Sequence, residues 1–90
     1  MKALQATVTL INKVGLHARP ATMFVQTAKK FKSQIKIRKN NNIVDAKSII
    51  GVLSLGAERG DEVTIIVEGE DAEDALNALL DLIKNKFGEE

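Results

Sequence analysis

The residue of this chain best suited to group transfer is His17, the only histidine among 90 residues. Arg19 lies two positions later and is followed by Pro20, the only proline. Proline is tolerated in the first turn of a helix, so the pattern predicts a helix that begins near His17 or Ala18. An unprotonated imidazole at such a helix start offers a nitrogen lone pair that can attack phosphorus.

The predicted surroundings of His17 suit a phosphoryl group. The amides of Ala18 and Arg19 would have no intrahelical partner and could donate to phosphate oxygens, while the helix dipole favours negative charge. The Arg19 guanidinium can add a charge-assisted contact. Spacing alone leaves a second interpretation open, because a single histidine before a helix is often only a cap or a solvated side chain.

The rest of the composition excludes many other chemistries. The chain has no cysteine, which excludes a disulfide framework, a thiolate nucleophile and a cysteine-based zinc site, and which suits the reducing cytoplasm. It has no glycine-rich phosphate loop, no metal-ligand cluster and no Ser-His-Asp set. We therefore expect neither a metal nor a cofactor. No apolar run approaches the ~20 residues of a membrane span, and no signal-peptide pattern is present, so we expect a cytoplasmic protein without membrane insertion.

Hydrophobic periodicity indicates which elements position His17. Alternating apolar and polar residues predict strands at residues 4–10, 34–38 and 62–68. A tight turn at the three asparagines 40–42 predicts a further short strand at residues 43–45, antiparallel to the strand before it. The amphipathic strands imply that one face of the sheet is exposed and that helices cover the other face.

Three helices are predicted between and after these strands. The first follows His17, and its last turn is expected to hold the lysines at 29, 30 and 32. A short helix begins after Ser48 and ends before Gly56. A final helix is expected to be capped by Asp71 and to carry one apolar face as far as Phe87. The order β-α-β-β-α-β-α in 1–90 predicts a single α+β domain, although the order of strands within the sheet is not readable.

Charge is distributed unevenly along the chain. Residues 1–48 carry ten Lys/Arg and one acidic residue, whereas residues 49–90 carry three Lys/Arg and eleven acidic residues. If the two halves formed different faces, the N-terminal face would be basic and would attract phosphate, nucleic acid or acidic proteins.

Two segments carry a resemblance to a known family. The run GLHARPA at residues 15–21 resembles the active-site signature of HPr, the histidine-containing phosphocarrier family of the bacterial sugar phosphotransferase system. The run AKSIIGVLSLG at residues 46–56 resembles the second, regulatory segment of that family. Both have the family spacing, and the resemblance covers essentially the whole chain. It implies an open-faced β-sandwich in which a four-stranded antiparallel sheet carries three helices on one side.

The resemblance also implies roles for the residues around His17. His17 would be phosphorylated on Nδ1 by Enzyme I, which is itself charged from phosphoenolpyruvate, and would donate the phosphoryl group to IIA components of sugar transporters. Arg19 and the amides of Ala18 and Arg19 would stabilise the phosphoryl group. Such a protein is a stoichiometric phosphoryl carrier and not an enzyme, and we expect it to be a monomer.

The second segment suggests regulation and partner binding. Ser48 matches the serine that an HPr kinase/phosphorylase modifies in Gram-positive relatives, whose phosphoserine form binds a catabolite-control repressor. Ser48 is also a good helix N-cap on its own. The short helix holds too many apolar residues to bury them all, so some form an exposed patch. By resemblance, Ile49, Ile50 and Leu53 would face partners beside His17, and Val52 and Leu55 are expected in the core. An apolar patch surrounded by the basic Arg19, Lys29 and Lys47 would suit a partner with an acidic, apolar groove.

Three alternatives stay open on the sequence. A purely regulatory relative would bind a repressor without carrying phosphate, but the HPr-like proteins of that kind lack the active-site histidine. A nucleic-acid-binding domain would need exposed aromatic residues for stacking, and the chain has only three Phe and no Tyr or Trp. A carrier of the nitrogen branch would have no role in sugar transport, and the regulatory serine segment argues against it.

Overall fold

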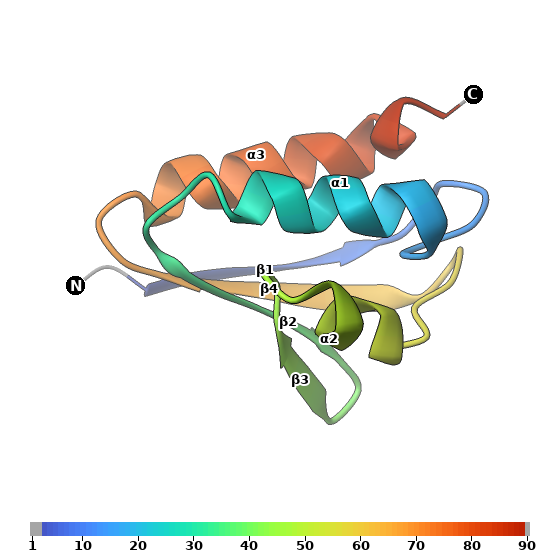
Figure 1. Cartoon of the computed structure of the whole chain (residues 1–90), viewed down its shortest axis with the longest axis horizontal. Helices are drawn as coiled ribbons and strands as arrows, with labels where there is room; N and C mark the ends of the chain where they lie inside the picture. Colours follow the sequence, from blue (N-terminus) through green and yellow to red (C-terminus); the bar gives the residue numbers. More distant parts are fainter. Residues whose placement is uncertain (1–2, 90) are drawn as a thin grey trace.

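A four-stranded antiparallel sheet carries three helices on one of its faces (Figure 1). The computed structural model describes residues 3–89. The elements, in chain order, are β1 (Ala3–Thr9), α1 (Ala18–Ala28), β2 (Gln34–Lys39), β3 (Asn42–Asp45), α2 (Ile49–Ser54), β4 (Glu62–Glu68), α3 (Ala72–Lys84) and a short 3-10 helix (Lys86–Gly88). This is the α+β order β-α-β-β-α-β-α that the sequence predicts.

The strands are arranged in the order β1-β4-β2-β3. The last strand in sequence is therefore central, where Ile65 of β4 pairs with Ala6 of β1 on one side and with Ile37 of β2 on the other. This arrangement interleaves the basic and acidic halves of the chain. The two halves of the chain therefore do not form separate faces, one basic and one acidic.

The strand alternation separates the two faces of the sheet. Val63, Ile65 and Val67 of β4 and Ile35 and Ile37 of β2 are buried under the helices. The open face is polar, and there the Thr7 and Thr64 hydroxyls of neighbouring strands lie 2.9 Å apart in a hydrogen bond. Because β1, β2 and β4 direct every second side chain to the covered face, period-two patterning identified these three strands, whereas the four-residue β3 has no buried side chain.

The first helix is shorter than the lysine pattern suggested. It ends at Ala28, and Lys29 is its C-cap, so the expectation of lysines in the last turn is wrong. The amide of Phe31 bonds to the Ala28 carbonyl, and the chain tightens into turns before β2. The lysines therefore follow the helix rather than lying on it.

Asp71 occupies the N-cap position of α3, but its side chain does not cap that helix. Its carboxylate instead accepts hydrogen bonds from the amides of Lys32 and Ser33, both at 2.9 Å, and from the Ser33 hydroxyl. These bonds lower the pKa of Asp71 from 3.8 to about 2, the Ser33 hydroxyl contributing most. Asp71 thus connects the start of α3 to the chain between α1 and β2.

The final helix is interrupted before the end of its apolar face. α3 stops at Lys84, and the chain continues as a 3-10 turn in which Lys86 and Phe87 both have φ of 54°. Phe87 is nevertheless buried, as expected for the end of that face. The left-handed residues turn the chain so that Phe87 reaches the core without continuing the helix.

Replacing Asp71 by Asn should destabilise the protein at neutral pH and much less in acid. The Asp71 pKa is lower in the folded state than in the unfolded chain, so its contribution is complete above about pH 4 and is lost as pH falls through about 2. Thermal unfolding of Asp71→Asn and wild type between pH 2 and pH 7 measures this convergence. Asp74→Asn, in the first turn of the same helix, is the matched control, and an Asp71→Asn deficit that is equal at both ends of the pH range would contradict the assignment.

Candidate functional site

The loop before α1 is attached to the chain that precedes β4. The Leu16 amide donates to the Ala57 carbonyl at 2.9 Å, the Leu10 amide donates to the Asp61 carbonyl at 2.9 Å, and the Gly60 amide donates back to the Leu10 carbonyl at 2.8 Å. Leu10 and Leu16 are fully buried. The loop that delivers His17 is therefore held at both ends by backbone bonds and by apolar side chains.

Gly15 is required for this close approach. Its φ is +65°, and a Cβ at this position would lie 2.5 Å from the Ala57 carbonyl oxygen and 2.6 Å from Cα of Glu58. Real Cβ contacts are not that short, so a larger residue would push the two segments apart. The possibility that Gly15 adopts a backbone conformation unusual for other residues is confirmed.

Asn12 supports the same loop from inside, a role that the sequence did not indicate. It is 1% exposed, and its Nδ2 donates to the Gly15 carbonyl at 2.9 Å and to Oε1 of Glu89 at 3.0 Å. The only sequence feature that pointed to Asn12 was its position in a turn-like stretch. The residue before Gly15 is Val14, which is exposed and has no polar side chain to supply such a bond.

The start of α1 leaves two amides available. His17 is the N-cap residue, with extended φ and ψ of −128° and 166° and no side-chain capping bond. The Ala21 amide bonds to the His17 carbonyl, and Pro20 has no N–H. Within residues 3–89, the amides of Ala18 and Arg19 are not used by any hydrogen bond outside the helix ladder. They are the helix-start donors that an anion beside His17 would meet.

Ala18 has an unusual backbone conformation for a residue with a side chain. Its φ is 47°, in the left-handed region. This conformation costs an L-residue roughly 1–2 kcal/mol. It directs the chain from the extended His17 into the helix within one residue.

The side chains of His17 and Arg19 lie at the surface. His17 is half-buried and Arg19 is exposed. Among the described residues, the one recorded ion pair joins Lys39 to Asp61, so the Arg19 guanidinium is not paired with a carboxylate there. An accessible imidazole, two amides and one guanidinium together can receive and hold a phosphoryl group.

Ser48 begins α2 as the sequence predicts. Its Oγ accepts a hydrogen bond from the Gly51 amide at 3.0 Å, which confirms the N-cap. Gly51 also leaves room at this point, because a Cβ there would lie 3.3 Å from the Ser48 Oγ. Leu55 is the C-cap, and Gly56 follows with φ of +59°.

The apolar residues of α2 divide into a buried set and an exposed set. Val52 and Leu55 are buried, as expected. Ile49, Ile50 and Leu53 are 38%, 79% and 41% exposed. We refer to these three residues as the α2 patch. The chain after α2 leads to Ala57, whose carbonyl accepts the hydrogen bond from the Leu16 amide, two residues before α1 begins. The α2 patch therefore lies on the element beside the start of α1.

The lysines assigned to partner binding are not gathered around His17. Lys29 is the C-cap residue of α1, about 18 Å along the helix axis from His17 at ~1.5 Å per residue. The Lys47 side chain is half-buried, and its Nζ donates to the Phe31 carbonyl at 2.7 Å. The structure therefore groups Ala18 and Arg19 with His17, and places Lys29 and Lys47 at the opposite end of the two helices.

Two absences within residues 3–89 bear on other functions. No group of three or more His, Cys, Asp or Glu side chains in this range is placed to hold a metal ion. None of the helices in the same range is long and apolar enough to cross a membrane.

The fold and the site are those of a class of small proteins that carry a phosphoryl group on one histidine. In this class the histidine lies at the start of a helix in an open-faced sandwich. Residues 4–85 match the family model described as the PTS HPr component phosphorylation site. The chain belongs to the HPr family, the phosphocarrier proteins of the phosphotransferase system.

Individual relatives agree with this assignment. The phosphocarrier protein HPr of Cupriavidus necator is 50% identical over 86 residues, which cover 96% of this chain and 97% of that protein. The crystal structure of HPr-C-His from Thermoanaerobacter tengcongensis is 56% identical and superposes with a TM-score of 0.95, covering 100% of this chain and 99% of that one. The fold class predicted from the sequence is confirmed.

A third similarity bears on assembly. Crh of Bacillus subtilis, a catabolite repression protein whose crystal structure is a domain-swapped dimer, is 42% identical and has a TM-score of 0.74, covering 92% of this chain and 95% of that one. A dimer among such similar folds weakens the expectation of a monomer. The relatives do not single out the Gram-positive branch.

Replacing Gly15 by Ala should cost far more stability than replacing Gly56 by Ala. Both glycines have φ near +60°, but a Cβ on Gly56 would meet nothing within 4 Å. Gly56→Ala should therefore lose only the left-handed conformational cost, about 1 kcal/mol. Gly15→Ala should lose a further ~1–3 kcal/mol through the clash with the Ala57–Glu58 backbone. Urea unfolding of both variants measures the difference, and equal losses would mean that the docking contact is loose.

Proposed function

We propose that His17 accepts a phosphoryl group on Nδ1 from Enzyme I and donates it to the IIA components of sugar transporters. The observation that carries this proposal is the set of unused amides of Ala18 and Arg19 at the helix start beside an accessible imidazole. Family membership supports the same assignment.

The transfer is reversible substitution at phosphorus. The Nδ1 lone pair attacks the phosphoryl group of the donor, the N–P bond to His17 forms, and the bond to the donor breaks so that its electron pair stays with the donor. The reverse process with a IIA acceptor regenerates the free imidazole. The protein is thus a stoichiometric carrier that needs neither a metal nor a cofactor of its own.

The helix start stabilises the transferred group. The amides of Ala18 and Arg19 donate to phosphoryl oxygens, the helix dipole favours their charge, and the Arg19 guanidinium adds a charge-assisted bond. Since these groups are at the surface, partners can approach the phosphorus directly. Moderate stabilisation keeps the phosphoryl group transferable.

Partner proteins dock on the α2 patch. The exposed Ile49, Ile50 and Leu53 offer an apolar surface on the element next to α1. Arg19 lies close to the site, whereas Lys29 and Lys47 act only at the far edge of such an interface. Among them Lys47 is already bonded to Phe31, so we assign it the smallest part in partner binding.

Incubation with phosphoenolpyruvate and Enzyme I should add one acid-labile phosphoryl group, about 80 Da of intact mass. His17→Ala should add none. Arg19→Gln should slow the transfer roughly ten- to a hundredfold, because one charge-assisted bond is lost. Arg38→Gln, on the open face of the sheet, is the matched control and should transfer normally. Absence of labelling with an Enzyme I that is active on another HPr would sink the carrier proposal, and labelling without onward transfer to a sugar IIA component would favour a nitrogen-branch carrier.

We further propose that Ser48 is a regulatory phosphorylation site for an HPr kinase/phosphorylase, and that the phosphoserine form binds a catabolite-control repressor, as in the Gram-positive type of HPr. The sequence around Ser48 and the 42% identity to Crh, a catabolite repression protein, support this step. The position also suits a phosphate, because the Gly51 amide already bonds to the Ser48 Oγ and Gly51 has no Cβ to crowd it. The cytoplasm, where these partners occur, is the proposed location.

Phosphorylation of Ser48 should leave the fold intact, since a phosphate at a helix start replaces the cap that it modifies. ATP and the kinase should label wild type and His17→Ala but not Ser48→Ala. Ser48→Ala itself should lose about 1 kcal/mol, or about 4–8 °C of melting temperature, through the missing cap. Ser54→Ala is the matched control in the same helix, since Ser54 donates only to the Gly51 carbonyl. Unchanged labelling of Ser48→Ala would place the modified residue elsewhere.

A further inference from the structure

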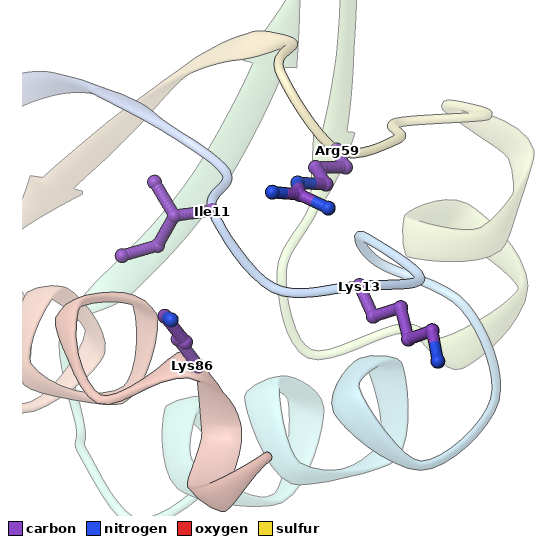
Figure 2. A pocket seen from close by; sticks show the side chains of 4 residues that line it. All are labelled: Ile11, Lys13, Arg59 and Lys86. Carbon is purple, nitrogen blue, oxygen red and sulfur yellow. The ribbon is translucent and has the colours of Figure 1, made fainter. Parts of the chain in front are cut away.

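A basic pocket lies behind the loop that leads to His17. It has a volume of about 240 Å³ and is lined by Ile11, Lys13, Arg59 and Lys86 (Figure 2). These residues come from three separate parts of the chain, namely the loop after β1, the turn before β4 and the 3-10 helix after α3. None of them belongs to the phosphoryl site or to the α2 patch.

The walls of this pocket are fixed to one another by hydrogen bonds. The loop after β1 and the turn before β4 are joined by the bonds between Leu10 and Asp61 and between Gly60 and Leu10. The same loop is joined to the C-terminal segment by the bond from Asn12 to Glu89. A ligand that enters the pocket would therefore meet a backbone that is already organised, which lowers the entropic cost of binding.

In the part of the chain that the structure describes, the cations that line the pocket are not paired with carboxylates. Within residues 3–89, none of Lys13, Arg59 and Lys86 makes an ion pair or a side-chain hydrogen bond. The nearby Glu89 carboxylate accepts from Asn12 through Oε1. Uncompensated cations gathered around a hollow raise the local concentration of anions.

The cationic groups come from different directions around Ile11. Figure 2 shows the Arg59 guanidinium to the upper right of Ile11 and the Lys86 ammonium below it, whereas the Lys13 ammonium is directed away from both. Lys13 has a flexible four-carbon stem and can swing its charge towards a bound anion. Ile11 is 42% exposed and gives the pocket an apolar wall.

We propose that this pocket binds a small phosphorylated metabolite that carries at least two negative charges. The planar Arg59 guanidinium suits two phosphate oxygens at once, and Lys86 and Lys13 supply point charges. Ile11 contacts the organic part of the ligand. A phosphate monoester concentrates almost two charges and three acceptors in one group, which suits a compact hollow better than the single, dispersed charges of an acidic peptide.

The test is a titration of the full chain, labelled with ¹⁵N, with sodium pyrophosphate at constant ionic strength. Saturable shifts are expected in the amides of residues 11–13, 59–60 and 86–88. The dissociation constant should rise about tenfold in Arg59→Gln/Lys86→Gln, which loses two charge-assisted contacts. It should be unchanged in Lys30→Gln/Lys36→Gln, which removes the same charge from exposed lysines elsewhere, and in His17→Ala, so the result does not depend on the carrier proposal.

Three outcomes would overturn the inference. Equal weakening in the two double variants would mean general attraction to a cationic protein. Shifts centred on Ala18 and Arg19 would mean that the anion binds at the start of α1 instead. A tighter response at the same pocket to a hexaglutamate peptide than to pyrophosphate would assign the surface to an acidic protein segment.

Discussion

The contact on which the site depends is the docking of Gly15 and Leu16 against Ala57 and Glu58. The Leu16 amide bonds to the Ala57 carbonyl, and the missing Cβ of Gly15 lets the two backbones approach. His17 is the next residue, so its backbone is positioned by this contact and not by its own side chain, which makes no capping bond. The backbone of His17 is therefore fixed, while its imidazole caps no helix amide.

A second constraint follows from how the chain enters α1. Because the loop is fixed on one side and the helix packs on the sheet on the other, a single residue must make the turn between them, and Ala18 does so with φ of 47°. This backbone conformation costs roughly 1–2 kcal/mol. The docking of the loop on Ala57 and the burial of Leu16 and Phe24 offset that cost. Within residues 3–89, the same turn leaves the amides of Ala18 and Arg19 without a protein acceptor outside the helix, so the strained residue lies at the anion site proposed above.

Much of this arrangement could be predicted from local signals. Period-two alternation identified three strands, and the asparagine turn at 40–42 indicated the fourth. The Ser48 cap predicted the start of α2, and Pro20 predicted the start of α1. Each of these signals depends on residues close in sequence. The central place of β4, the direction of the Asp71 carboxylate and the support from Asn12 depend on partners far along the chain, at Ile37, Ser33 and Glu89. No periodicity encodes such pairings, and the interruption of α3 before Phe87 likewise reflects tertiary packing.

The exposure of the α2 patch has its origin in the size of α2. A helix of six residues is too short to be stable alone and has only one fully helical residue in the core, Val52. It persists because Ser48 caps one end and because Leu55 and Ala57 anchor the other, so its remaining apolar residues need not be buried. Three exposed side chains offer far less area than a stable interface requires. As the docking surface proposed above, Ile49, Ile50 and Leu53 would therefore support only brief contacts, which would let a carrier release one partner before it reaches the next.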